Sequence, residues 1–482
     1  MLAPAQRLEA ITVCQTKRFL ERFSADVGFR AELARDPIAA ARARGLPVDP
    51  REIRPLWDPS CAEPPGSANG CGPTAAYRRF HQAKLRRRAE MAHACAPADP
   101  RFGAWRERQQ NRCRGQFGVA YAAGILHAPA CFELTSGCSV GCGFCGLCAP
   151  PLRAIAPYDT AGRQLWREAL EVIRALCGAA AGHAACYWAT DPFDNPDYEQ
   201  FLADFRAILG RYPQTTTALA LRDPERTRAL LQATASTGAI NRFSVLTLAQ
   251  LDRIHRTFSA AELATVELVP QMPGSSLLRS ASGRARLRGA AEDPPPYLAP
   301  LAGGGEELAY PAPPDAPWTP TSIACVSGFL INLPERTVAL ISPCPASDEN
   351  PLGYLTLAHG AFATAADLER TLGDMIGSQM PIALGPDDFV RLREDLEVTV
   401  TPSGFQLATP FRRVSVDTPR GGAHLRQLAE LLRQPRRVSE LELLLCYTCA
   451  TPAEATRRQL DRLFAAGLLA WGRDGAPAAA QP

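Results

Sequence analysis

From residue 129 onward, strand-like and helix-like segments alternate, and this alternation constrains the fold more than any other feature. Strands separated by helices predict βαβ units and a parallel sheet, which binds ligands at the carboxyl ends of its strands. The predicted strands are 130–134, 183–189, 214–221, 241–247 and 263–269, and the predicted helices are 160–178, 196–212, 223–236 and 248–258. A later stretch, 322–345, reads as two strands joined by a short turn.

The rest of the chain divides into recognisable parts around this core. The predicted parts are a helical unit at 1–57, a helical and loop connector at 58–125, the core at 126–350, a mixed α/β extension at 351–420 and a winged-helix-like domain at 421–475. A Pro/Gly-rich insertion at 284–320 is expected to form a loop or lid. In the first unit, Asp36 should cap a helix that begins at Pro37, and Gly45 should end it.

Composition limits the setting in which the chain works. The 482 residues include 16 cysteines, far below the density of a secreted disulfide scaffold. The N-terminus shows no signal-peptide pattern, and no run of eighteen apolar residues occurs, so we expect a cytoplasmic protein without a membrane partner. The formal net charge of +3 is low for a nucleic-acid binder, so we expect no nucleic-acid partner.

Five cysteines crowd the stretch CFELTSGCSVGCGFCGLCAP at 131–150. Three of them, Cys138, Cys142 and Cys145, have the spacing C-x3-C-x2-C after a predicted strand. Structural zinc commonly takes four ligands in two pairs, and the C-x2-C pair of Cys446 and Cys449 lies some 300 residues away. Three thiolates on one glycine-rich loop instead predict a [4Fe–4S] cluster with one iron free of protein ligands.

This motif resembles the radical S-adenosylmethionine (SAM) superfamily over roughly 129–345. The resemblance implies an α/β fold with a partial (βα)6 barrel, and SAM chelating the open iron. It places Phe144 near the adenine, and it places Thr190 and Asp191 of WATDPFDNPDY near the methionine end, although the family usually has Gly-Gly-Glu-Pro there. Ser244 either faces the ribose or methionine or is an ordinary sheet serine, and Cys148 is expected to be a bystander.

Within that superfamily, FELTSGCSVGCGFCG and YWATDPFDNPDYEQFL resemble the peptide epimerases of proteusin (polytheonamide-type) maturation. This resemblance implies that L-residues of a ribosomally made precursor peptide become D-residues. It implies two partners, a precursor peptide with its leader and an external flavodoxin- or ferredoxin-type electron donor. The segment FRAELARDPIAAARARGLPVDPREI at 29–53 is similar to the nitrile-hydratase-like leaders of such precursors, and it is expected to support docking or folding.

Epimerisation needs a hydrogen donor on the face opposite to abstraction, and a thiol suits this step because its S–H bond is comparable in strength to a peptide Cα–H. Cys344, held between Pro343 and Pro345 after the barrel, is the predicted donor, with Cys325 in reserve. The alternative for either residue is a small buried side chain.

Three other functions remain open. Another peptide-modifying radical SAM enzyme, forming thioether or C–C bonds, usually carries a cysteine-rich C-terminal domain, and only Cys446 and Cys449 occur late here. A cobalamin methyltransferase would carry a D-x-H-x-x-G signature, which is absent from the sequence. A non-enzymatic iron–sulfur regulator would place arginines 457, 458 and 462 of the winged-helix-like domain on DNA phosphates.

Overall fold

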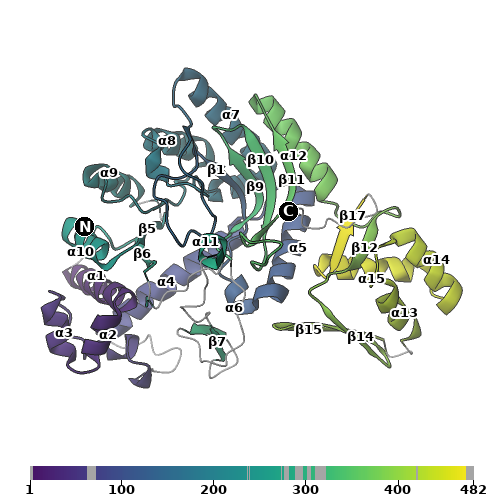
Figure 1. The fold of residues 1–482 in the computed structure, drawn as a ribbon, viewed down its shortest axis with the longest axis horizontal. Helices are drawn as coiled ribbons and strands as arrows, with labels where there is room; N and C mark the ends of the chain where they lie inside the picture. The colour runs from purple at the N-terminus through teal and green to yellow at the C-terminus, as the bar shows by residue number, and fades with distance from the viewer. Residues whose placement is uncertain are drawn as a thin grey trace.

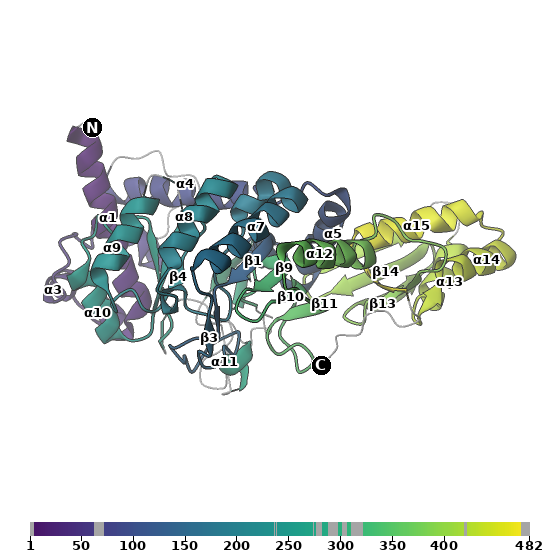
Figure 2. The ribbon, with the colours of Figure 1, turned by 90° about the horizontal axis from the view of Figure 1, so that it is seen from above.

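The computed structural model describes residues 4–61, 72–235, 237, 239–272, 274–275, 282–287, 297–300, 306–309, 322–418 and 422–473. The molecule is elongated, with N-terminal helices at one end, sheets in the middle and C-terminal helices at the other end (Figure 1). A view turned by 90° shows the same order along the long axis (Figure 2). The structure is therefore a mixed α/β protein, as the alternating pattern predicts.

Helices make up the described part of the N-terminal unit. They are α1 (Pro4–Ala25), α2 (Val27–Leu33), α3 (Pro37–Ala43) and two short 3-10 turns, η1 (Arg54–Leu56) and η2 (Pro59–Cys61). The Asp36 carboxylate accepts from the Ala39 amide and Gly45 has φ +63°, which confirms the predicted start and end of α3. Helix α1 lies against α10 (Leu248–Thr257), where Arg22 pairs with Asp252 and the Arg18 guanidinium donates to the Phe258 carbonyl at 2.6 Å.

Three helices connect this unit to the sheets: α4 (Pro73–Ala94), α5 (Pro100–Phe117) and α6 (Val119–Ala122). Asp99 caps α5 by accepting from the amides of Arg101 and Phe102, and Pro100 occupies the first helical position. Helix α5 then reaches the C-terminal part of the molecule, where the Arg108 guanidinium lies 4.2 Å from the centre of the Phe464 ring.

The larger sheet has the order β1-β9-β10-β11, formed by β1 (Ala128–Glu133), β9 (Val326–Asn332), β10 (Thr337–Pro343) and β11 (Tyr354–Ala361). Strand β1 is parallel to β9, while β10 is antiparallel to both of its neighbours. The expected pair of strands within 322–345 is therefore confirmed as β9 and β10. Their antiparallel pairing puts the end of β10 beside the start of β9, away from the end of β1.

A second, all-parallel sheet has the order β4-β5-β6, formed by β4 (Thr216–Thr217), β5 (Asn241–Val245) and β6 (Val266–Pro270). The predicted strand at 183–189 is wrong as a full strand, because within the described part of the chain its ladder contact is limited to the isolated parallel bridge from Ala185 to Cys131. This segment nevertheless runs between the two sheets. The helices that separate the strands are α7 (Thr160–Cys177), α8 (Tyr198–Leu209), α9 (Pro224–Thr234) and α10 (Leu248–Thr257), with 3-10 turns η4 (Gly178–His183) and η5 (Pro192–Asp194).

Alternating side chains give each sheet an outer and an inner face. On the outer face, Phe132 of β1 packs edge-on against Trp166 of α7, with ring centroids 4.9 Å apart. On the inner face, a smaller apolar cluster gathers Cys131, Trp188 and Val326. In the second sheet, Phe243 and Val245 pack outward on α10, which leaves Arg242 and Ser244 on the other face. The inner face is therefore where polar and reactive side chains collect.

Short elements complete the core. Strands β2 (Thr135–Ser136) and β3 (Ala154–Ile155) pair at the two ends of the cysteine-rich stretch. Of the predicted insertion, the structure describes only part: the end of α11 (Gly283–Leu287) and an antiparallel pair, β7 (Tyr297–Pro300) and β8 (Glu306–Ala309). The remainder of 284–320 lies outside the described residues.

The C-terminal part begins with α12 (Ala365–Gln379), which packs on the larger sheet. Two three-stranded sheets follow, with orders β16-β12-β17 and β13-β14-β15. Their strands are β12 (Phe389–Leu392), β13 (Glu397–Thr401), β14 (Gly404–Thr409), β15 (Arg412–Asp417), β16 (Arg436–Arg437) and β17 (Leu469–Gly472), and the helices are α13 (Ala423–Leu431), α14 (Val438–Cys449) and α15 (Ala453–Ala465). The winged-helix assignment stays a prediction.

Candidate functional site

The three predicted cluster ligands lie on one loop that leaves the carboxyl end of β1 through β2. The thiols of Cys138, Cys142 and Cys145 are all half-buried, and none of them forms a disulfide. The loop closes where the Cys138 amide donates to the Pro150 carbonyl at 2.9 Å. Gly137 permits this closure, because its φ is +83° and a Cβ there would lie 2.2 Å from the Pro151 carbonyl oxygen.

Asp194 of η5 holds one side of this loop. Its carboxylate accepts from the Ser139 amide at 2.8 Å and from the Ser139 hydroxyl at 2.5 Å. Arg222 donates to both partners, at 3.2 Å to Asp194 and 2.8 Å to Ser139. The residue next to the first cysteine is thus fixed by a charged pair that comes from two other βα connections.

Arg284 of α11 holds the other side. Its amide donates to the Cys145 carbonyl at 2.8 Å, and its guanidinium donates to the carbonyls of Cys142, at 3.0 Å, and Ala149. Ser282 adds a bond from its hydroxyl to the Gly146 carbonyl at 3.1 Å. Ser282 and Arg284 therefore hold backbone carbonyls on both sides of the third cysteine through hydrogen bonds.

The chemistry of this loop fits an iron–sulfur cluster. Burial raises the pKa of Cys138 to about 11 and also raises the pKa of Cys142, so both thiols are protonated without a metal at neutral pH. In the described ranges, no three His, Cys, Asp or Glu side chains converge closely enough to hold one metal ion. Three thiols on one loop are a donor set that suits an iron–sulfur cluster, whose protein ligands are cysteine thiolates.

Asp191, predicted to contact SAM, is 4% exposed and already has three donors. Its carboxylate accepts from the Phe193 amide at 3.0 Å, from the Thr217 hydroxyl at 2.7 Å and from the Ala218 amide at 2.7 Å. Burial raises its pKa to about 6 despite these bonds. Asp191 thus ties the end of the 184–191 segment to β4. Thr190 precedes it and is half-buried.

Glu133, which the sequence analysis did not single out, ends β1 beside the same segment. Its carboxylate accepts from the Ala189 amide and from the Asn332 side-chain amide, both at 3.0 Å. Burial raises its pKa to about 7. A charged residue closing a wholly buried strand was the available sequence signal.

The other residues predicted to contact SAM are Phe144 and Ser244. Phe144 is half-buried on the cysteine loop, and Ser244 lies on β5, on the face opposite the buried Phe243. Cys148 is half-buried with φ +50°, an uncommon conformation for a residue other than glycine.

The two predicted hydrogen donors lie in different surroundings. Cys325 is half-buried and belongs to the inner apolar cluster together with Cys131 and with Leu147 of the cysteine loop. Cys344 is 4% exposed at the end of β10, and burial raises its pKa to about 12, although the charge of Arg112 on α5 acts to lower it. Cys325 therefore shares an apolar cluster with Leu147 of the loop, while Cys344 packs against α5.

The late cysteines and arginines lie apart from this site. Cys446 is exposed on α14, and the Cys449 thiol donates to the Gln427 side chain at 2.9 Å. Arg457 is engaged by Glu442 at 2.6 Å and by the Leu384 carbonyl at 2.7 Å. An arginine held in this way is poorly available for DNA phosphates.

The fold and this loop define a mixed α/β protein with three thiols displayed after a parallel strand. No known protein-family model matches the sequence. The uncharacterized protein y4wI of Sinorhizobium fredii is 37% identical over 473 residues, spanning 95% of this chain and 87% of that protein. The chain belongs to the same family as this protein.

One solved structure, BtrN in complex with AdoMet and 2-DOIA, overlaps 30% of this chain and 56% of that chain at 16% identity, with a TM-score of 0.23. An overlap of this size carries no conclusion about fold or chemistry. No helix among the described residues is both long and apolar enough to cross a bilayer.

Proposed function

We propose that this protein is a radical SAM enzyme that converts L-residues to D-residues in a ribosomally made precursor peptide. One observation carries the proposal: three half-buried thiols with C-x3-C-x2-C spacing lie on a braced loop at the carboxyl end of a parallel strand. Cys138, Cys142 and Cys145 would hold a [4Fe–4S] cluster. When bound, the reduced cluster and SAM supply a carbon-centred radical that removes a hydrogen atom.

Residues around the end of β1 would receive SAM. Glu133 and Asp191 are the carboxylates beside this end, and a carboxylate stabilises an ammonium group through a charge-assisted hydrogen bond. Since Asp191 already accepts three bonds within the protein, Glu133 is a second candidate for that contact. As the resemblance implies, Thr190 would lie near the methionine end of SAM, Phe144 near the adenine and Ser244 near the ribose or methionine.

Cys325 is the hydrogen donor in this proposal, in preference to Cys344. Its thiol lies in the same cluster as Leu147 of the cysteine loop, whereas the Cys344 thiol is packed against α5. Burial raises the pKa of Cys325, so the residue carries the S–H hydrogen that it must give. The thiol hydrogen passes to the planar Cα radical of the peptide. The sulfur radical left behind takes one electron from an external reductant and one proton from solvent.

The test uses full-length protein, reconstituted with iron and sulfide without oxygen, and a precursor peptide encoded beside its gene. Reaction in deuterated water should place one deuterium on the Cα of each inverted residue and none elsewhere. 5′-Deoxyadenosine should form in the same reaction. A peptide that gains a thioether or C–C crosslink, with no D-residue, would assign the alternative radical SAM chemistry. Protein that holds iron but leaves SAM intact would contradict the enzyme assignment.

A further inference from the structure

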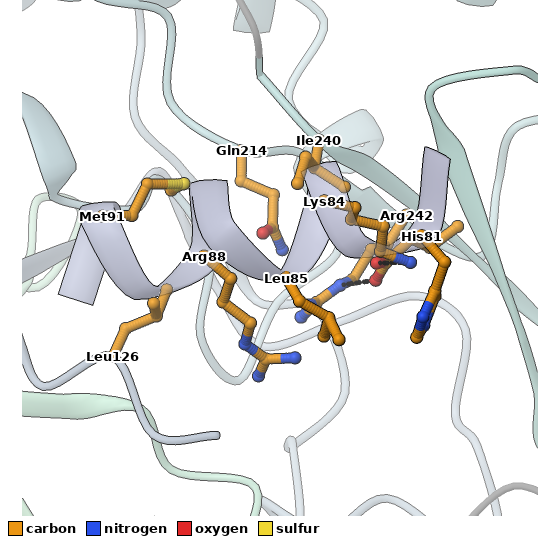
Figure 3. Close-up of a pocket in the computed structure, with 10 residues that line it drawn as sticks. His81, Lys84, Leu85, Arg88, Met91, Leu126, Gln214, Ile240 and Arg242 are labelled. Carbon is orange, nitrogen blue, oxygen red and sulfur yellow. Dashed lines mark hydrogen bonds and ion pairs between the residues drawn. The ribbon is translucent and has the colours of Figure 1, made fainter. Parts of the chain in front are cut away.

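A separate pocket lies at the amino ends of the parallel strands, whereas the cysteine loop leaves their carboxyl ends. Its volume is about 130 Å³. It is lined by residues of α4 and by Leu126, Gln214 and Ile240, which precede β1, β4 and β5 (Figure 3). No step of the proposed reaction uses this pocket.

Cations outnumber anions around the pocket. Lys84 and Arg242 both bind the carboxylate of Glu267, at 2.5 and 2.7 Å. Arg88 is the third cation that lines the pocket. With His81 neutral, these side chains leave a formal excess of two positive charges. Arg88 and Arg242 both line the pocket, and the pKa of Arg88 is lowered by burial and by the charge of Arg242.

Arg88 also has an unused hydrogen-bond donor. Its Nη2 donates to the Gly124 carbonyl at 2.5 Å, while its Nε is buried without a partner among the described residues. A buried donor without an acceptor costs free energy, and such groups are rare in folded proteins. The excess of positive charge around the pocket favours an occupant that carries negative charge.

We propose that this pocket binds a small oxyanion, a carboxylate or a phosphate group, which lies beside the cationic side chains of Arg88, Arg242 and Lys84. Guanidinium groups are suited to planar oxyanions, because their N–H donors form a fixed fork. The volume corresponds to about four water molecules, which matches a phosphate or a short carboxylate and is too small for a folded peptide segment.

The test is isothermal titration of the purified full-length protein with inorganic phosphate and, separately, with glutarate. We expect saturable one-to-one binding of at least one of them. Arg88→Gln should weaken that binding by about tenfold or more, since a charge-assisted hydrogen bond is lost. Arg87→Gln removes the same charge from an exposed position on α4 and should leave the affinity unchanged.

Arg88→Lys keeps the positive charge and loses Nε, so its affinity should lie between those of the wild type and Arg88→Gln. Tighter binding of phosphate than glutarate would assign a phosphate ligand, and the reverse order would assign a carboxylate. The proposal is overturned if the wild type binds neither probe. It is equally overturned if Arg88→Gln and Arg88→Lys both bind as tightly as Arg87→Gln. Since binding is measured without turnover, neither result bears on the radical chemistry.

Discussion

The carboxylate of Asp194 binds both the amide and the hydroxyl of Ser139, at 2.8 and 2.5 Å, and so anchors the residue that follows the first cysteine of the loop. The two residues lie 55 positions apart in the chain. This contact joins the loop after β1 to the turn before α8. The loop is therefore shaped by the fold around it before any cofactor arrives.

Asp194→Ala should loosen the cysteine loop. Removal of a buried acceptor leaves the Ser139 amide without its partner and takes away one of the two acceptors of Arg222, at a cost of roughly 1–3 kcal/mol. We expect a lower melting temperature of the apoprotein. After reconstitution, the variant should hold fewer irons per chain than the wild type, which should hold about four. Asp197→Ala, which removes a nearby carboxylate bound to the Gln200 side chain, is the matched control. Full iron uptake by Asp194→Ala would show that this anchor is dispensable.

Arg284→Gln should expose the other side of the loop. The variant loses guanidinium bonds to the carbonyls of Cys142 and Ala149, and these bonds come from a segment 142 residues away. We expect faster alkylation of Cys142 and Cys145 in the apoprotein, measured by mass spectrometry of the modified peptides. Arg286→Gln is the control, because Arg286 lies on the same helix and pairs with the exposed Asp348 instead. Equal alkylation rates in the two variants would contradict a bracing role for Arg284.

Glu133 should make the stability of the apoprotein depend on pH. Burial raises its pKa from 4.5 to about 7, so the folded state holds this proton more tightly than the unfolded chain does. Its contribution is therefore most favourable below about pH 4.5 and is lost as the pH rises to about 7, with an upper limit on the order of 3 kcal/mol.

Glu133→Gln removes this titration. The melting temperature of the wild type, relative to that of Glu133→Gln, should fall between about pH 5 and about pH 7.5. A relative melting temperature that stays constant over this range would mean that Glu133 is ionised throughout. The same variant should weaken SAM binding if Glu133 receives the SAM ammonium group.

Much of the core could be predicted from the sequence, because buried and partly exposed positions alternate in β5 and β6, and β1 is a short, mostly apolar segment. The segment 183–189 was predicted as a strand and forms only one bridge. Side-chain hydrogen bonds replace the backbone ladder there. The Cys131 thiol donates to the Tyr187 carbonyl at 2.7 Å, and the Gln214 side-chain amide donates to the Tyr187 hydroxyl at 2.7 Å. No local pattern signals contacts of this kind.

The three cysteines of the loop could be found by their spacing, whereas the residues that brace them could not. Asp194 and Arg284 reach the loop from distant parts of the chain, and only the folded structure brings them there. The preference for Cys325 over Cys344 stays a proposal. It rests on the surroundings of the two thiols, because the proline flanks of Cys344 indicate rigidity and do not indicate which way the thiol faces.

The most direct test of the central claim compares Cys325→Ala with Cys344→Ala on the precursor peptide in deuterated water. The account predicts that Cys325→Ala still forms 5′-deoxyadenosine and yields no D-residue, while Cys344→Ala yields D-residues that carry one deuterium at Cα. Inactive Cys344→Ala beside normal Cys325→Ala would move the donor to Cys344. Deuterated D-residues from both variants would contradict hydrogen donation by either thiol.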